Sequence, residues 1–164
     1  MMDLPVQDKF VSEINPHQKI IYKICYLYTN NSTDFNDLYQ EIILQLWKSY
    51  SKFEGKSKLS TWIYRVSLNT ALYRLRQEKN RLQIDLLSQL HYDIPEIEDF
   101  EKKESVERVK ELLGNLSDIE KAIITLYLDE YSHDEISEIM GITKTNIATR
   151  INRIKLKLKQ KFNN

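Results

Sequence analysis

Glycine and proline are scarce in this chain of 164 residues, with three of each. Because both residues interrupt helices and build turns, their scarcity favours long helices joined by short connections. The chain also lacks an extended run of alternating apolar and polar residues, and no Asn-Gly or Asp-Gly pair marks a hairpin turn. We therefore expect an all-α fold.

Cysteine and histidine are also rare. Cys25 is the single cysteine, which excludes an internal disulfide and any metal site built from several cysteines. Its isoleucine-rich surroundings predict a core residue rather than a nucleophile. The three histidines, His17, His91 and His133, lie far apart, and none has a ligand or nucleophile partner nearby in sequence. We expect no metal, no cofactor and no enzymatic activity.

Long hydrophobic runs are missing as well. No apolar stretch approaches the roughly 18 residues that a membrane span needs. The N-terminus lacks the apolar core of a signal peptide. The sequence thus predicts a cytoplasmic protein without direct membrane insertion.

The charges that are present cancel to a net charge of zero, but they are unevenly distributed. Residues 48–81 hold nine lysines and arginines against two acids, whereas residues 85–107 hold eight acids against two lysines. Residues 144–164 hold seven basic residues and no acid. Two cationic blocks around an acidic segment are typical of a polyanion-binding protein, although helices with solvated charged faces give the same pattern.

The acidic segment also divides the chain, because it contains Pro95, the last proline. We predict two small helical domains, over residues 1–84 and 106–164, joined by an acidic linker over residues 85–105.

The first domain contains a helix predicted to run from a cap at Asp34 to about Tyr50. At about 100° per residue, its large apolar side chains fill one arc, which is expected to face the core: Leu38, Tyr39, Ile42, Ile43, Leu46 and Trp47. The opposite face surrounds one leucine with polar groups: Asp37, Gln40, Glu41 and Leu44. That face is either a solvated surface with a lone exposed leucine or a docking face for another protein.

A second helix of this domain is predicted to begin near Ser60 or Thr61, after a connection that contains Gly55. One stripe along it combines aromatic, guanidinium and amide groups: Trp62, Arg65, Asn69, Tyr73 and Arg76. Aromatic rings stack on unpaired bases while arginines neutralise phosphates, so the stripe suits single-stranded nucleic acid. Alternatively, the aromatics close the edge of the core and the arginines cover them.

The second domain carries a sharper pattern. Two capping boxes, Ser117 with Glu120 and Ser132 with Glu135, each open a helix. Gly141 follows the second, short helix, and Thr143 caps a third, longer one. A short helix, a glycine turn and a longer helix form the helix-turn-helix pattern.

The third helix divides into two faces. Its isoleucines form a buried stripe, and the polar residues near its N-terminal end face the other way: Lys144, Thr145, Asn146, Thr149, Arg150 and Arg153. Small polar groups can read base edges in a major groove while arginines hold phosphates. The alternative is an ordinary amphipathic terminal helix.

Taken together, the residues resemble the RNA polymerase sigma factors of the small extracytoplasmic-function (ECF) group of the sigma-70 family. Residues 34–80 are similar to the family's second conserved region, and residues 116–162 are similar to its fourth. The resemblance implies a protein that binds RNA polymerase core and directs promoter recognition, −10 melting and transcription initiation. It also implies an anti-sigma partner, often a membrane-anchored one.

The resemblance assigns roles to individual residues. It implies that the polymerase clamp helices are gripped through Asp37, Gln40, Glu41 and Leu44. Contacts to the promoter −10 element fall to Lys56, Lys58, Ser60, Thr61, Trp62, Tyr64, Arg65, Asn69, Tyr73, Arg74 and Arg76, with Arg74 and Arg76 along the DNA backbone. Contacts to the −35 duplex fall to Lys144, Thr145, Asn146, Thr149, Arg150 and Arg153.

The sequence departs from the family's common pattern at two places, and one other class of protein competes with the resemblance. Many members have Leu-Pro where Leu116-Ser117 stands and Gly-Thr where Thr145-Asn146 stands, and the second change alters the base-reading end of the helix. A transcriptional activator of the response-regulator output type has a very similar terminal helix-turn-helix. Such an activator would bind duplex DNA without being a polymerase subunit, but residues 1–85 show neither strands nor a phosphoacceptor pattern.

Overall fold

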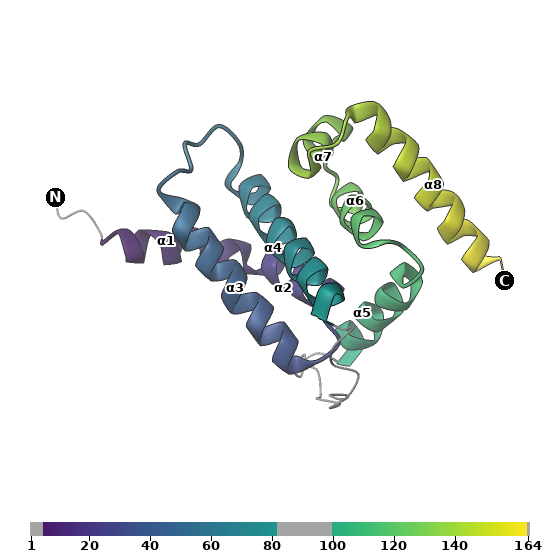
Figure 1. Ribbon diagram of the computed structural model, residues 1–164, viewed down its shortest axis with the longest axis horizontal. Coiled ribbons are helices and arrows are strands. Elements are labelled where there is room, and N and C mark those ends of the chain that lie inside the picture. The colour runs from purple at the N-terminus through teal and green to yellow at the C-terminus, as the bar shows by residue number, and fades with distance from the viewer. Residues whose placement is uncertain (1–4, 82–99, 164) are drawn as a thin grey trace. The chain divides into compact units, whose positions relative to one another are not determined.

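The computed structural model describes the backbone of residues 5–81 and 100–163, and the side chains of residues 5–79 and 107–163. Within these ranges the regular elements are all helical, which confirms the predicted all-α class. The chain divides into two compact units, residues 1–95 and residues 96–164 (Figure 1). The predicted linker of residues 85–105 lies largely outside the described residues, and helix α5 already begins within it, at Phe100.

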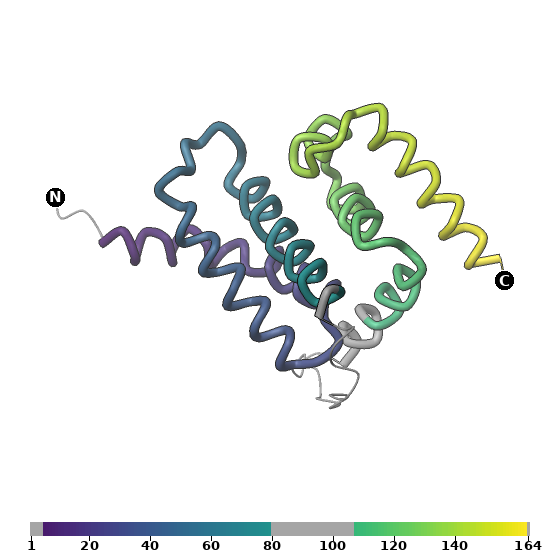
Figure 2. Tube along the Cα trace, in the orientation of Figure 1, coloured from purple at the N-terminus to yellow at the C-terminus, as the bar shows by residue number. Residues whose placement is uncertain are grey.

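The first unit is a helical bundle. It contains α1 (Val6–Ile14), a 3-10 turn (Asn15–His17), α2 (Gln18–Tyr28), α3 (Ser32–Tyr50) and α4 (Leu59–Arg81). Helices α2, α3 and α4 pack against one another, and each contributes side chains that are at most 1% exposed: Ile21, Ile24, Leu38, Ile42, Leu46, Ile63 and Leu68. Figure 2 follows the connection of residues 51–58 that arches from α3 into α4.

Helix α4 is buried on more than one side, because it packs against both α2 and α3. Buried side chains therefore occur around much of its circumference, including Ile63, Leu68 and Leu72. The helix begins at Leu59, one residue before the earlier of the two predicted starts.

Cys25 is fully buried in this core. Burial raises the pKa of its thiol to about 12, and the nearby Arg74 charge offsets this only in part. The thiol is therefore protonated near neutral pH, which agrees with the predicted core role rather than a nucleophilic one.

Two details of α3 differ from the prediction. The helix begins at Ser32 and its cap is Asn31, whose side-chain oxygen accepts a hydrogen bond from the Asp34 backbone N–H at 2.8 Å. Asp34 was the wrong cap because both residues can cap and Asn31 lies one turn earlier. Trp47, expected in the core, is 41% exposed. Its indole meets the Phe10 ring of α1 edge-on, with 5.1 Å between ring centroids.

The second unit contains α5 (Phe100–Leu113), α6 (Asp118–Leu128), α7 (His133–Met140) and α8 (Lys144–Phe162). Helices α6, α7 and α8 all contact one another, and α5 contacts α8. Their shared core includes Ile123, Leu126, Ile136, Ile147 and Ile151, each at most 1% exposed.

The predicted helix signals of this unit are confirmed. Both capping boxes are complete, with the serine side chain and the glutamate side chain each bonded to the other's backbone N–H. Gly141 adopts the left-handed conformation at φ 66°, and Thr143 caps α8 by accepting from the Asn146 N–H. Helices α7 and α8 thus form the expected helix-turn-helix.

Candidate protein and nucleic-acid interfaces

The candidate docking face lies on α3. Residues 37, 40, 41 and 44 recur at helical spacing on the side opposite the buried Leu38, Ile42 and Leu46. Leu44 is 47% exposed, and the Asp37 and Glu41 side chains are 59% and 38% exposed. The structure therefore presents the four predicted residues, Asp37, Gln40, Glu41 and Leu44, along one accessible strip of helix.

Arg74 does not sit with the exposed cations of α4. Its side chain is 19% exposed, and its guanidinium points at carboxylates of α3 and α4. The Nε–H donates to Glu78 Oε1 at 3.0 Å. The terminal nitrogens lie 3.6 to 3.9 Å from the carboxylates of Asp34, Asp37 and Glu41. The structure thus brings this predicted DNA contact together with the docking face.

The first turns of α4 hold aromatic rings, but these rings are covered. Trp62 is 8% exposed because Phe53, from the preceding connection, stacks on it with 4.9 Å between ring centroids. A base can reach this indole face only if Phe53 moves.

The neighbours of Trp62 are also covered. Tyr64 is 1% exposed, and its hydroxyl accepts a hydrogen bond from Lys23 Nζ of α2 at 3.2 Å. Thr61 is 5% exposed. For these three residues the core interpretation describes their positions better than an open stacking surface does.

The rest of the predicted stripe is accessible. Asn69, Tyr73 and Arg76 are exposed, Tyr73 at 59%. Lys56 and Lys58 of the connection are exposed too, and Lys56 pairs with Glu54 at 2.9 Å. Ser60 and Arg65 are half-buried.

Arg65 has a further peculiarity. Its Nε is buried and has no hydrogen-bond partner among the described residues. A buried guanidinium nitrogen without a partner is costly, so an acceptor that reached this nitrogen would relieve that cost.

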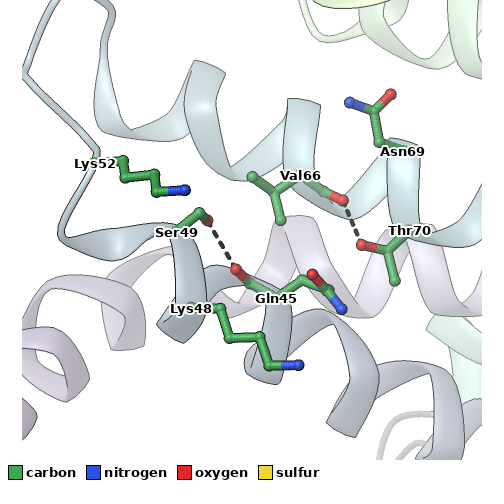
Figure 3. Close-up of a pocket in the computed structure, with 7 residues that line it drawn as sticks. All are labelled: Gln45, Lys48, Ser49, Lys52, Val66, Asn69 and Thr70. Atoms are coloured by element: carbon green, nitrogen blue, oxygen red, sulfur yellow. Dashed lines mark hydrogen bonds between the residues drawn. The ribbon is translucent and has the colours of Figure 1, made fainter.

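A pocket of about 340 Å³ lies between α3 and α4 (Figure 3). Its lining is Gln45, Lys48, Ser49, Lys52, Val66, Asn69 and Thr70. The hydroxyls of Ser49 and Thr70 bond to carbonyls of their own helices, those of Gln45 and Val66. The groups that remain for a ligand are two ammonium groups and two amides, which can donate to phosphate oxygens or base edges.

Sequence reasoning placed Asn69 in the candidate site but missed Gln45, Lys48 and Lys52 beside it. Lys48 and Lys52 were part of the basic block of residues 48–81; Lys48 lies in the last turn of α3 and Lys52 in the turn just after its end. Nothing in the sequence showed that α4 would bring Asn69 against that side.

The helix-turn-helix presents the predicted base-reading residues. Thr145, Asn146, Thr149 and Arg153 are exposed, and Arg150 is half-buried, all away from the buried Ile147, Ile151 and Ile154. Arg150 Nε donates to Asn146 Oδ1 at 3.0 Å, which orients the amide for further bonds through its NH₂ group. Lys144 pairs with Asp134 of α7 at 3.2 Å.

The described residues contain no cluster of histidine, cysteine and acidic side chains suited to a metal ion. None of their helices is both long enough and apolar enough to cross a membrane. The described surfaces present an acidic strip with a leucine, a pocket lined by two lysines, and a polar helix face suited to a groove.

Known proteins share this organisation. Residues 14–81 match the family model described as sigma-70 region 2, and residues 107–158 match the model described as sigma-70, region 4. The ECF RNA polymerase sigma factor SigW of Bacillus subtilis (strain 168) is 29% identical over 160 residues, covering 90% of this chain and 85% of SigW. RNA polymerase sigma factor SigS of Staphylococcus aureus (strain NCTC 8325 / PS 47) is 27% identical over 157 residues, covering 94% and 99%.

Among solved structures, the sigma factor RpoE from Bartonella quintana, in complex with the anti-sigma factor NepR, has a similar fold. The TM-score is 0.71 at 19% sequence identity, over 93% of this chain and 95% of that chain.

Proposed function

Because the chain belongs to the sigma-70 family, in its ECF group, we propose that it is a sigma factor that binds RNA polymerase core and directs it to promoters. The single observation that carries this proposal is the tandem of a region 2 match and a region 4 match in that order within one chain. An activator of the response-regulator type has no reason to carry region 2.

Core polymerase binds, in this proposal, to the α3 strip of Asp37, Gln40, Glu41 and Leu44. Leu44 supplies an apolar anchor that is already exposed in the free chain. The surrounding acids steer and orient a basic partner surface. Docking would remove the apolar surface of Leu44 from water, which favours association.

Region 4 binds the −35 element as duplex. The α8 N-terminal end enters the major groove, where Thr145, Asn146 and Thr149 face base edges. Lys144, Arg150 and Arg153 hold the phosphates on either side. The Arg150–Asn146 bond fixes which amide group faces the bases.

Region 2 opens and holds the −10 element. Unstacking a base costs a few kcal/mol, and stacking on an aromatic side chain returns about 1–3 kcal/mol per base. Tyr73 is the aromatic of the stripe that is open to a base in the free chain. The neighbouring pocket, with Lys48, Lys52 and Asn69, is suited to the phosphates of the extruded strand.

Trp62 becomes available only after Phe53 swings away, so we propose that the connection of residues 51–58 rearranges when DNA binds. Lys56, Lys58, Ser60 and Thr61 then approach the strand. Tyr64 supports the site from within the core, and Arg65 supplies its Nε–H, which has no partner among the described residues.

This mechanism is binding coupled to strand separation, without covalent chemistry. We place the protein in the cytoplasm, where core polymerase and promoter DNA are. We also propose an anti-sigma partner, because the similar RpoE structure contains its anti-sigma factor NepR.

The test is transcription by a reconstituted enzyme. Purified core from the source cells is incubated with fragmented genomic DNA, with and without the chain, and RNA 5′ ends are mapped. The proposal expects new 5′ ends that share two sequence elements at a fixed separation. If the chain adds no 5′ ends but shifts duplex DNA on its own, the activator function replaces the sigma-factor function.

A further inference from the structure

We infer that Arg74 is a positioning residue of the polymerase-docking face rather than a contact to the DNA backbone. The inference rests on the proposed function, because it concerns how the α3 strip is held ready for core polymerase. It replaces the role that the resemblance gave to this arginine.

The Arg74 guanidinium lies among four carboxylates. Its Nη2 lies 3.6 Å from Asp34 and 3.9 Å from Asp37, and its Nη1 lies 3.8 Å from Glu41. Its Nε–H bonds to Glu78, one turn further along α4, at 3.0 Å. Every nitrogen of the guanidinium therefore has an acidic neighbour.

The three α3 carboxylates lie at positions 34, 37 and 41, one helical turn apart, along the edge of α3 nearest Arg74. Without a cation beside them, like charges at this spacing repel and would turn their side chains apart. Arg74 provides that cation from the partly buried side, since its side chain is 19% exposed while those of Asp37 and Glu41 are 59% and 38% exposed. The Asp37 and Glu41 carboxylates are thus held by Arg74 on one side and open to solvent on the other.

The arrangement leaves an excess of negative charge for a partner. Four carboxylates surround a single guanidinium, so the cluster remains acidic after Arg74 is counted. Asp37 and Glu41 can therefore accept bonds from a basic surface of core polymerase while they keep their contact with Arg74. A guanidinium suits this role because its planar fork presents five N–H donors in a fixed geometry, whereas an ammonium has three donors on a flexible stem.

The position argues against a DNA-backbone role for the same reason. A phosphate that approached Arg74 would meet the carboxylates of Asp34, Asp37, Glu41 and Glu78 within the same cluster. Arg76, two residues further along α4, is exposed and has no such acidic neighbours among the described residues. Arg74 therefore has a role in the docking face, and Arg76 has a role in DNA binding.

The first experiment measures association and dissociation of core polymerase with the wild-type chain, Arg74→Gln and Arg74→Lys. Anchoring two carboxylate side chains in advance saves their ordering cost on binding, so its loss is expected to speed dissociation roughly tenfold. Association is expected to stay level or to rise at low salt, because Arg74→Gln makes the face more acidic. Arg74→Lys, which keeps the charge but not the fork, is expected to fall between the two.

Controls separate this effect from a general loss of structure. Lys9→Gln removes one exposed cation of the same unit and is expected to leave both rates unchanged. Glu78→Gln loosens the Arg74 guanidinium without touching α3 and is expected to speed dissociation by a smaller factor. In a Glu41→Gln background the effect of Arg74→Gln should shrink, because one of the anchored groups is already gone.

The DNA role is tested in the same preparations, at a promoter located by mapping the 5′ ends. With core and chain at saturating concentrations, Arg74→Gln is expected to open the promoter as the wild type does. Arg76→Gln should assemble with core normally and open the promoter less. Dissociation of Arg74→Gln within twofold of wild type would overturn the inference, with or without a promoter defect, and would leave the sigma-factor function intact. Failure of the wild type itself to bind core would overturn both.

Discussion

Replacing Gly141 tests the turn that sets the two helices of the helix-turn-helix against each other. This glycine ends α7 at φ 66° and ψ 29°, in the left-handed region. An added Cβ would meet no atom within 4 Å, so an alanine fits the space. The cost of Gly141→Ala is therefore a backbone cost alone.

The magnitude follows from two opposing effects. An L-residue in the left-handed region costs about 1–2 kcal/mol. Alanine also restricts the unfolded chain, which returns about 0.4–1 kcal/mol. The net loss in the free energy of unfolding of the second unit should be about 1 kcal/mol, which corresponds to roughly fivefold faster exchange of amides that open with it.

Hydrogen exchange measures this directly, because it reports individual amides. The informative ones are Ile136 N–H, bonded to Ser132 O, and Ile147 N–H, bonded to Thr143 O, each at 2.9 Å. Gly141→Asn is the matched variant, since asparagine tolerates the left-handed region better than alanine. Both tryptophans, Trp47 and Trp62, lie in the first unit, so tryptophan fluorescence should show its urea midpoint unchanged.

Exchange in Gly141→Ala no faster than in wild type at these amides would contradict a cost set by the left-handed backbone. Faster exchange in Gly141→Asn than in Gly141→Ala would contradict it too, because the order would then not follow the backbone conformation.

Three further predictions concern the two interfaces and the pH dependence. Arg153→Ala should weaken duplex promoter binding across sequences and lower the slope of log affinity against log salt by about 1, as expected for one lost phosphate contact; a sequence-selective loss at unchanged slope would instead indicate base reading. The double variant Lys48→Gln, Lys52→Gln should weaken binding of a single-stranded −10 oligonucleotide by the holoenzyme and leave core capture intact, whereas Lys9→Gln should change neither. If the double variant and Lys9→Gln bind the oligonucleotide equally well, the α3–α4 pocket does not contact the DNA. Burial works to raise the pKa of Glu120, but hydrogen bonds from Lys157 and Ser117 outweigh it and hold the pKa below its ordinary value. A carboxyl with a lowered folded pKa stabilises the native state above its unfolded pKa, and this contribution disappears as the pH falls through the folded pKa. Glu120→Gln should therefore lower the free energy of unfolding at pH 7 by about 1 kcal/mol, in the range of a helix cap, and by less near pH 3. Urea unfolding followed by circular dichroism measures both losses, and equal losses at the two pH values would contradict this prediction.

The fold prediction was most accurate where it rested on local sequence signals. Ser117, Ser132 and Thr143 cap the helices where the sequence indicated, because a cap depends on residues within three positions. Gly141 adopts the conformation that glycine tolerates best. The cap of α3 was misplaced because Asn31 and Asp34 carry equivalent side-chain acceptors, and periodicity does not choose between them.

Contacts between distant segments could not be read from the sequence. Trp62 has the spacing of an exposed stripe, but Phe53 covers it from a connection without periodicity. The resemblance assigned Arg74 to the DNA backbone, but this residue meets acids that lie 33 to 40 positions earlier in the chain. Periodicity assigns a residue to a side of its helix, and packing decides what that side meets.

Capture of RNA polymerase core is the most direct test that this chain docks on the polymerase through the α3 strip. The wild-type chain, Glu41→Lys and the control Asp8→Lys, an equal charge reversal at an exposed position of α1, are each presented to purified core from the source cells. We expect capture by the wild type and by Asp8→Lys, and loss of capture by Glu41→Lys. Capture by all three would move the interface away from the α3 strip, and no capture by the wild type would contradict the sigma-factor function itself.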